Sequence, residues 1–162
     1  MAGVAVTASG EGESLWFLDT LMQVKLASAD ARGALSVFEQ LAPPGSATPL
    51  HRHDHTDEYF YVLAGEVTFH TDAGARACGA GAFVSVPRGT PHAFRVTSAD
   101  EAKLLVIATP SNFEDFVRAV SRPAGNAGLP PAAPPPSAEM VQQLAAIGGE
   151  HDTVLLGPPP AG

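Results

Sequence analysis

The sequence predicts an all-β domain, either a sandwich or a barrel, followed by a short helical tail. Short runs of apolar and β-branched residues follow one another at spacings of about 8 to 12 residues, with no helical period among them. Glycines fall at turn-like positions between these runs, from Gly33 to Gly89. After Pro110 the apolar residues change to a helical period. The predicted strands are residues 21–27, 34–42, 58–63, 66–71, 82–86, 91–97 and 103–109.

Length and charge limit the classes of protein that the chain can represent. It has 162 residues, of which 45% are hydrophobic, enough for one domain with a core and too few for two full-sized ones. Lysine and arginine number 9 against 17 acidic residues, a formal net charge of −8. This balance argues against nucleic acid as a partner, because phosphate binding needs a basic surface. No apolar run approaches the roughly 20 residues of a membrane span, so we expect no membrane association.

The N-terminal segment and the cysteine content predict where the protein resides. Residues 1–14 are small and acidic, without the basic and apolar regions of a signal peptide, and we expect them to be flexible. Cys78 is the single cysteine, which excludes an internal disulfide and a zinc site made of cysteines. We therefore expect a soluble, cytoplasmic protein.

Residues 111–162 are predicted to form a tail with two short helices and a proline-rich linker. The first helix has its apolar residues at positions i, i+3, i+4 and i+7, and Ser111-Asn112-Phe113-Glu114 fits a capping box at its start. Proline is then concentrated in residues 123–136, which predicts a stiff linker. The apolar stripe consists of Phe113, Phe116, Val117 and Val120.

The second tail helix is predicted to begin after Ser137 and to stop at Gly148-Gly149. Val154-Leu155-Leu156 is a last apolar segment. The apolar stripes favour a tail that packs on the barrel or on a second subunit, whereas the prolines alone would also fit a disordered tail. The stripe of this helix consists of Met140, Val141, Leu144 and Ile147.

Histidines give the strongest functional signal in the chain. His51 and His53 are two residues apart, so on a strand both side chains point to the same face. Glu58 begins the next strand and His92 begins a distant one. In a small barrel, three imidazoles and one carboxylate from these positions can converge on a divalent first-row metal and leave coordination positions open for catalysis.

Other polar residues of this region have a structural interpretation. A His-x-His pair also occurs in solvated turns, and most histidines bind no metal. His55 lies in a polar loop and is expected to be exposed or to contact the site only indirectly, and His70 is expected to be an ordinary strand residue. Asp54 and Asp57 are interpreted as loop carboxylates that could orient an imidazole.

The spacing of these residues resembles both conserved motifs of the cupin superfamily. Residues 45–65 contain every element of Gly-x5-His-x-His-x(3,4)-Glu-x6-Gly. Residues 81–96 fit Gly-x5-Pro-x-Gly-x2-His-x3-Asn, except that Val96 replaces the final Asn. The flanking strands extend the resemblance to residues 15–110. The resemblance implies a double-stranded β-helix, or jelly-roll, barrel at residues 15–110, with His51, His53, Glu58 and His92 as metal ligands.

Strand parity predicts a substrate pocket beside the metal. Phe60 and Val62 share the face of Glu58, and Phe94 and Val96 share that of His92. The four residues make a mostly apolar wall, and the metal with its ligands is the one polar part of the pocket. Such a pocket suits an aromatic or hydrophobic oxygenated substrate. A sugar phosphate fits less well, because no lysine or arginine has the inward parity in these two strands.

The resemblance extends to small single-domain bacterial cupins similar to quercetin 2,3-dioxygenase. It implies a metal-dependent dioxygenase acting on a small aromatic or enol-type substrate, with dioxygen as a second substrate. One divalent ion per chain (Fe, Ni, Mn, Co or Zn) would be the cofactor, and Glu58 would be a ligand or a catalytic base. Two alternatives stay open: a metal-dependent cyclase or isomerase in secondary metabolism, and a non-catalytic cupin that binds a small molecule.

The opposite face of the strand at 58–63 predicts self-association. Tyr59, Tyr61 and Leu63 have the outward parity. Left uncovered, they would form an unusually apolar patch. A two-fold homodimer or the tail helices would cover it.

Overall fold

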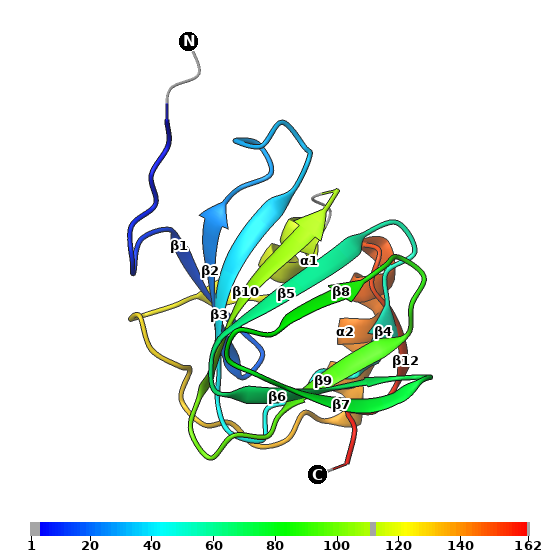
Figure 1. Cartoon of the computed structure of the whole chain (residues 1–162). Helices are drawn as coiled ribbons and strands as arrows, with labels where there is room; N and C mark the ends of the chain where they lie inside the picture. The colour runs from blue at the N-terminus through cyan, green and yellow to red at the C-terminus, as the bar shows by residue number, and fades with distance from the viewer. Residues whose placement is uncertain (1–3, 111–112, 162) are drawn as a thin grey trace.

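Two antiparallel sheets face each other and enclose the core in the computed structural model, which describes residues 4–110 and 113–161 (Figure 1). This arrangement is an all-β double-stranded β-helix, as predicted. The large sheet has the spatial order β11 (Arg122–Pro123), β1 (Glu13–Phe17), β2 (Thr20–Leu26), β3 (Ser36–Ala42), β10 (Ala102–Thr109), β5 (Asp57–Ala64) and β8 (Phe83–Val86). The small sheet has the order β12 (Val154–Gly157), β4 (Leu50–Arg52), β9 (His92–Val96), β6 (Glu66–Thr71) and β7 (Gly74–Gly79).

Each strand predicted from the apolar runs is present, with ends that differ by at most two residues. Several strands lay outside the prediction, among them β1, β7 and β12. β7 has the sequence Gly-Ala-Arg-Ala-Cys-Gly, which lacks the β-branched and aromatic residues typical of strands. Glu13 and Ser14 begin β1, although they fall within the segment expected to be flexible. β12 pairs with β4 from far along the chain.

The core lies between the sheets and follows strict alternation along the central strands. β3 and β10 bury every second residue. Phe38, Val62 and Leu104 are fully buried in the large sheet, and Val67 meets them from the small sheet as part of the same core. Burial of these side chains on both inner faces stabilises the sandwich at about 25 cal/mol for each Å² removed from water.

Gly65 shows why the β5–β6 turn needs glycine. Its φ is 75°, in the left-handed region. A Cβ atom there would lie 2.8 Å from the Cα of Ala102 and 2.9 Å from the carbonyl oxygen of Glu101. The motif glycines Gly45, Gly81 and Gly89 also have positive φ, which agrees with the turns expected from the sequence.

The first tail helix, α1 (Phe113–Val120), closes one end of the core as its apolar stripe predicted. Phe113 and Phe116 are buried and stack edge-to-face on Phe17 at ring separations of 6.4 and 5.8 Å. Ser111 and Asn112 of the expected capping box lie outside the described residues.

The second tail helix, α2 (Ala138–Glu150), begins where the sequence predicts and ends later. The Ser137 hydroxyl accepts a hydrogen bond from the Met140 amide at 3.2 Å. Gly148 does not stop the helix; it is buried and lies against Thr153, where a Cβ atom would be 2.6 Å from the Thr153 carbonyl oxygen. Leu144 and Ile147 pack on the core, whereas Met140 and Val141 are exposed.

The tail therefore folds back onto its own barrel. After α2, β12 adds to the small sheet, and Leu155 pairs with His51 of β4. Arg95 of β9 donates two hydrogen bonds to the Pro160 carbonyl, at 3.2 and 2.7 Å. Figure 1 shows α2 and β12 beside β4.

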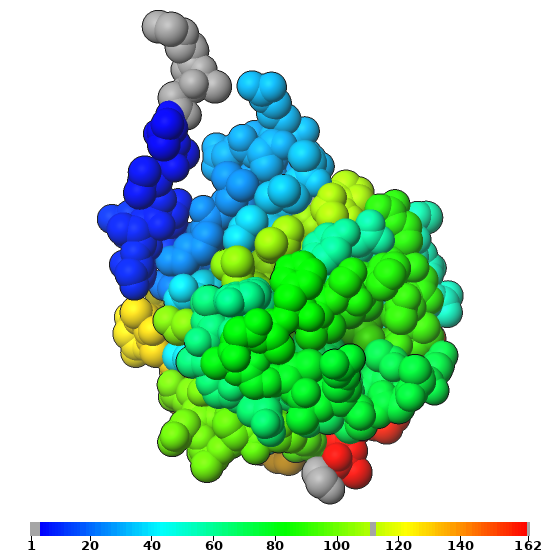
Figure 2. Space-filling view, in the orientation of Figure 1, coloured from blue at the N-terminus to red at the C-terminus, as the bar shows by residue number. Residues whose placement is uncertain are grey.

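The N-terminal segment and the loop after β2 protrude from the barrel (Figure 2). Near its base, the N-terminal segment is tied to β2, because Lys25 donates to the carbonyls of Ala8 and Glu11. Within residues 4–110 and 113–161, neither helix has the length and apolar character needed to cross a membrane.

Candidate metal centre

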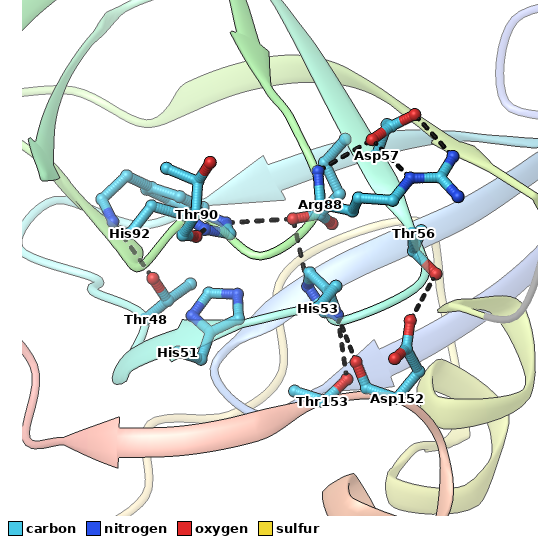
Figure 3. Close-up of polar contacts among 12 residues, drawn as sticks. Thr48, His51, His53, Thr56, Asp57, Arg88, Thr90, His92, Asp152 and Thr153 are labelled. Atoms are coloured by element: carbon cyan, nitrogen blue, oxygen red, sulfur yellow. Dashed lines mark hydrogen bonds and ion pairs between the residues drawn. The ribbon is translucent and has the colours of Figure 1, made fainter.

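Three histidines and one glutamate meet inside the barrel between the two sheets. His51 lies on β4, His53 follows that strand, His92 begins β9, and Glu58 comes from β5 of the opposite sheet. All four side chains are buried, and one potential ligand atom from each lies within 4.8 Å of the others. His51 and His92 are direct partners in the β4–β9 pair, which places their rings 4.3 Å apart. This group could hold a metal ion (Figure 3).

Main-chain carbonyls orient all three imidazoles in the same way. In each ring Nδ1 lies within hydrogen-bond distance of a carbonyl oxygen, so the Nδ1–H tautomer donates and Nε2 is left for the centre. Such a contact fixes both the tautomer and the ring orientation of a histidine ligand. The acceptors are Pro49 for His51 at 2.8 Å, Asp152 for His53 at 2.9 Å and Thr90 for His92 at 3.0 Å.

Glu58 supplies the negative charge of the centre. Its Oε2 lies 3.0 Å from Nε2 of His92 and 3.2 Å from Nε2 of His53. Burial by itself would raise the pKa of Glu58, but the charges and hydrogen bonds of His53 and His92 outweigh it and hold the pKa well below its usual value. The carboxylate is therefore ionised and acts as an acceptor.

The pKa values of His51 and His53 shift in opposite directions. Burial lowers the pKa of His51 to about 3, and His92 adds to the effect, so His51 is neutral and its Nε2 carries a lone pair. Burial also opposes protonation of His53, but the charge of Glu58 and a hydrogen bond to it raise the pKa of His53 above its ordinary value. In the absence of a metal ion, the charge of Glu58 favours a proton on His53.

The donor set fits a divalent transition metal. Nε2 of His53 is buried and faces Oε2 of Glu58 at 3.2 Å, without the geometry of a well-formed hydrogen bond. A lone pair on this atom would face the Glu58 carboxylate, an arrangement that a cation between them would stabilise. Three imidazole nitrogens and one carboxylate oxygen suit borderline first-row ions.

Asp152 is a residue of the centre that sequence reasoning missed. Besides its carbonyl bond to His53, its carboxylate accepts hydrogen bonds from the amides of Asp54 and His55 at 3.0 Å and from the Thr56 hydroxyl at 2.8 Å. It therefore holds the segment that joins β4 to β5. The turn sequence after α2 carries no signal for this contact, because the partners are nearly 100 residues away along the chain.

Asp57 clamps the loop that precedes His92. Its carboxylate accepts from the Arg88 amide at 2.8 Å and from Nε and Nη2 of the same residue at 3.0 and 2.8 Å. These bonds lower the pKa of Asp57 to about 2. The neighbouring Gly89 amide donates to the His53 carbonyl at 2.6 Å, so the loops that carry the histidines are joined to each other.

The remaining candidate residues lie outside the centre. His55 is exposed and belongs to none of the four ligand positions. His70 is a half-buried strand residue of β6 that pairs with Ala93. Asp54 contacts Arg52 at 2.7 Å in an exposed ion pair and orients no imidazole through its side chain.

An apolar cavity adjoins the centre. His51 and Glu58 form part of its wall. Of the residues predicted for the pocket, Phe60 and Phe94 line the cavity. Val62 and Val96 point inward but belong to the packed core, where their exposures of 0% and 2% leave no surface for a ligand. The other lining residues are Phe17, Leu18, Met22, Gln40, Thr48, Pro49, Val106, Phe113, Phe116, Leu144, Thr153 and Leu155.

Comparison with known proteins agrees with this architecture. Residues 38–108 match the cupin domain family. Quercetin 2,3-dioxygenase of Bacillus subtilis (strain 168) is 32% identical over 118 residues, which cover 73% of this chain and 35% of the relative. The chain thus spans about a third of the length of that curated relative.

Solved structures show the same fold at lower identity. A predicted oxalate decarboxylase from Thermotoga maritima superposes with a TM-score of 0.58 at 24% identity, covering 65% of this chain and 98% of that one. The polyketide cyclase RemF from Streptomyces resistomycificus superposes with a TM-score of 0.52 at 22% identity, covering 85% and 83%. The barrel, its two sequence motifs and the family match identify the class: the chain contains a cupin domain.

Proposed function

We propose that the protein is a metal-dependent dioxygenase that acts on a small aromatic or enol-type substrate. The observation that carries the proposal is the position of the centre, because Glu58 and His51 form part of the wall of an apolar cavity. A site that opens on a cavity suits catalysis, whereas a structural metal is enclosed by its ligands. The relationship to quercetin 2,3-dioxygenase supports the reaction class.

The metal ligands in this proposal are His51, His53, Glu58 and His92. A bound divalent ion would supply Lewis acidity to an enol oxygen of the substrate. Glu58 is the proposed base: its carboxylate is ionised at neutral pH and accepts the proton of the substrate hydroxyl. His51 stays neutral and contributes no competing positive charge. The buried Nδ1 contacts keep the three rings fixed while the substrate exchanges.

The cavity wall defines the proposed substrate class. Phe60, Phe94, Phe113 and Phe116 line the space and can stack on a flat ring. No lysine or arginine is among the described lining residues, so the cavity offers no counter-charge to a phosphate. This lining favours a neutral or singly ionised aromatic enol over a sugar phosphate.

The test is dioxygen uptake by metal-free protein reconstituted separately with Fe, Mn, Co, Ni or Zn. Flavonols with a free enol hydroxyl are the first substrates. We expect uptake that requires both the metal and the flavonol and that is lost in Glu58→Gln. His70→Ala, on β6 outside the centre, is the matched control and should keep its activity. Conversion of an enol substrate without oxygen uptake would instead support the cyclase or isomerase alternative, and binding without conversion would support a binding protein.

A further inference from the structure

The cavity has a single polar side chain away from the metal centre. Among the described lining residues, the other polar groups are Thr48, His51, Glu58 and Thr153, and all of them lie at the metal end. Thr48 contacts the main chain of β9, and Thr153 lies 3.3 Å from the His53 ring. Gln40, on β3, has only 5% of its surface exposed and lines the cavity among apolar groups.

Strand register gives the separation between Gln40 and the metal centre. Glu58 pairs with Ala108 of β10, whereas Gln40 pairs with Leu104 of the same strand. The two positions are four residues apart along β10, a distance of about 13 Å at the usual rise of a strand. Gln40 therefore lies at the far end of the cavity from Glu58.

Hydrogen bonds fix the orientation of the Gln40 amide. The Thr20 hydroxyl donates its one proton to the Phe17 carbonyl at 2.8 Å, so its oxygen can only accept from Gln40. Nε2 of Gln40 fills this role at 3.4 Å. The hydrogen bond to Thr20 does not use Oε1, which can accept from a molecule in the cavity that Gln40 lines.

We propose that Gln40 forms a second binding point for the substrate and accepts a hydrogen bond from its distal hydroxyl group. The inference rests on the proposed function, since it places the enol end of the ligand at the metal centre. It narrows the substrate class to aromatic enols that carry a hydroxyl donor at the opposite end. A site that accepts a hydrogen bond from a substrate hydroxyl discriminates against analogues that lack this hydroxyl.

The experiment measures ligand affinity of zinc-loaded protein under nitrogen, so that no turnover intervenes. The probes are 3-hydroxyflavone and two derivatives that carry one further hydroxyl, at C4′ or at C7. We expect one derivative to bind about tenfold more tightly than 3-hydroxyflavone, the value of one net hydrogen bond. In Gln40→Met this preference should disappear, while the affinity for 3-hydroxyflavone stays within about twofold, because this probe has no distal hydroxyl for Gln40 to accept from. Glu39→Gln, the adjacent position of β3 with the opposite parity, is the matched control and should keep the preference.

Each outcome separates this inference from the proposed reaction. Equal affinity of wild-type protein for all three probes, or a preference that survives in Gln40→Met, overturns the role of Gln40 even if oxygen uptake occurs. A preference that depends on Gln40 without any oxygen uptake supports the binding point and overturns the dioxygenase. Failure to bind any of the probes overturns both the flavonol class and the binding point.

Discussion

The carbonyl oxygen of Asp152 accepts a hydrogen bond from Nδ1 of His53 at 2.9 Å, although 99 residues separate the two along the chain. Asp152 has a φ of 58°, a left-handed conformation that aspartate tolerates better than most residues. This turn between α2 and β12 directs both its carbonyl and its carboxylate toward the loop after His53. The C-terminal tail is therefore part of the candidate metal centre.

Loss of the Asp152 carboxylate is expected to weaken metal binding. In Asp152→Ala the amides of Asp54 and His55 and the Thr56 hydroxyl lose their acceptor, so the loop that carries His53 becomes less ordered. Removal of such supporting contacts typically costs about 10- to 100-fold in metal affinity. Calorimetric titration of the metal-free protein with zinc measures the change.

Two variants control for this result. Asp152→Asn should retain most of the affinity, because its amide oxygen still accepts from the loop amides and asparagine tolerates the left-handed conformation. Asp72→Ala, which removes an exposed carboxylate in the β6–β7 turn, should have no effect. Unchanged zinc affinity in Asp152→Ala would contradict a role for the tail in the centre.

The histidines should separate into two groups by mutation. His53→Ala and His92→Ala each remove a buried nitrogen beside Glu58, and we expect tight metal binding to be abolished. His55→Ala and His70→Ala alter side chains outside the centre and should leave binding nearly intact. Elemental analysis of protein purified without an affinity tag gives the metal content of each variant. A loss in His55→Ala equal to that in His53→Ala would show that the ligand set is wrong.

Local sequence patterns predicted which four residues gather at the candidate centre, because their spacing follows strand geometry. His51 and His53 flank a strand end, and the motif spacing brings Glu58 and His92 to the same interior. Parity also placed Phe60 and Phe94 on the cavity wall. Parity indicates only which face a residue occupies, so it could not distinguish these residues from Val62, which is sealed in the core.

Contacts that depend on the docking of distant segments could not be predicted. Asp152 reaches the centre only because β12 pairs with β4, and one short apolar run after a helix does not specify that pairing. In the sequence, Gln40 is a polar residue of an alternating strand, and nothing marks it as part of a cavity. In the structure its position is buried and points inward. Gly148 resembles a helix stop in the sequence, and its close contact with Thr153 depends on the tertiary fold.

The outer face of β5 and β8 is predicted to form a homodimer interface. Tyr61, Leu63 and Phe83 are 40%, 41% and 61% exposed, and Tyr59 stacks on Phe83 at 6.0 Å. β8 is also an edge strand of the large sheet, with main-chain groups available for pairing. We propose that a second copy of the chain covers this face by a two-fold contact, which is self-complementary.

Light scattering coupled to gel filtration tests the interface. We expect wild-type protein to have the mass of a dimer and Phe83→Glu that of a monomer, because a charge in the centre of the patch would be buried without a partner. Met140→Glu, at an exposed apolar position on α2, is the control and should remain dimeric. Monomeric wild-type protein would contradict the proposed interface.

Two adjacent glycines of α2 offer a direct test of how the tail supports the centre. A methyl group at Gly148 would meet the Thr153 carbonyl at 2.6 Å, so Gly148→Ala must displace the chain next to Asp152. Gly149 has no atom within 4 Å of its Cβ position, and Gly149→Ala should be neutral or stabilise the helix by about 0.5 to 1 kcal/mol. For Gly148→Ala we expect a loss of about 1 to 3 kcal/mol in unfolding free energy together with weaker zinc binding. Urea unfolding and zinc titration of both variants measure the difference, and an equal response of the two would mean that the close contact with Thr153 does not matter for the centre.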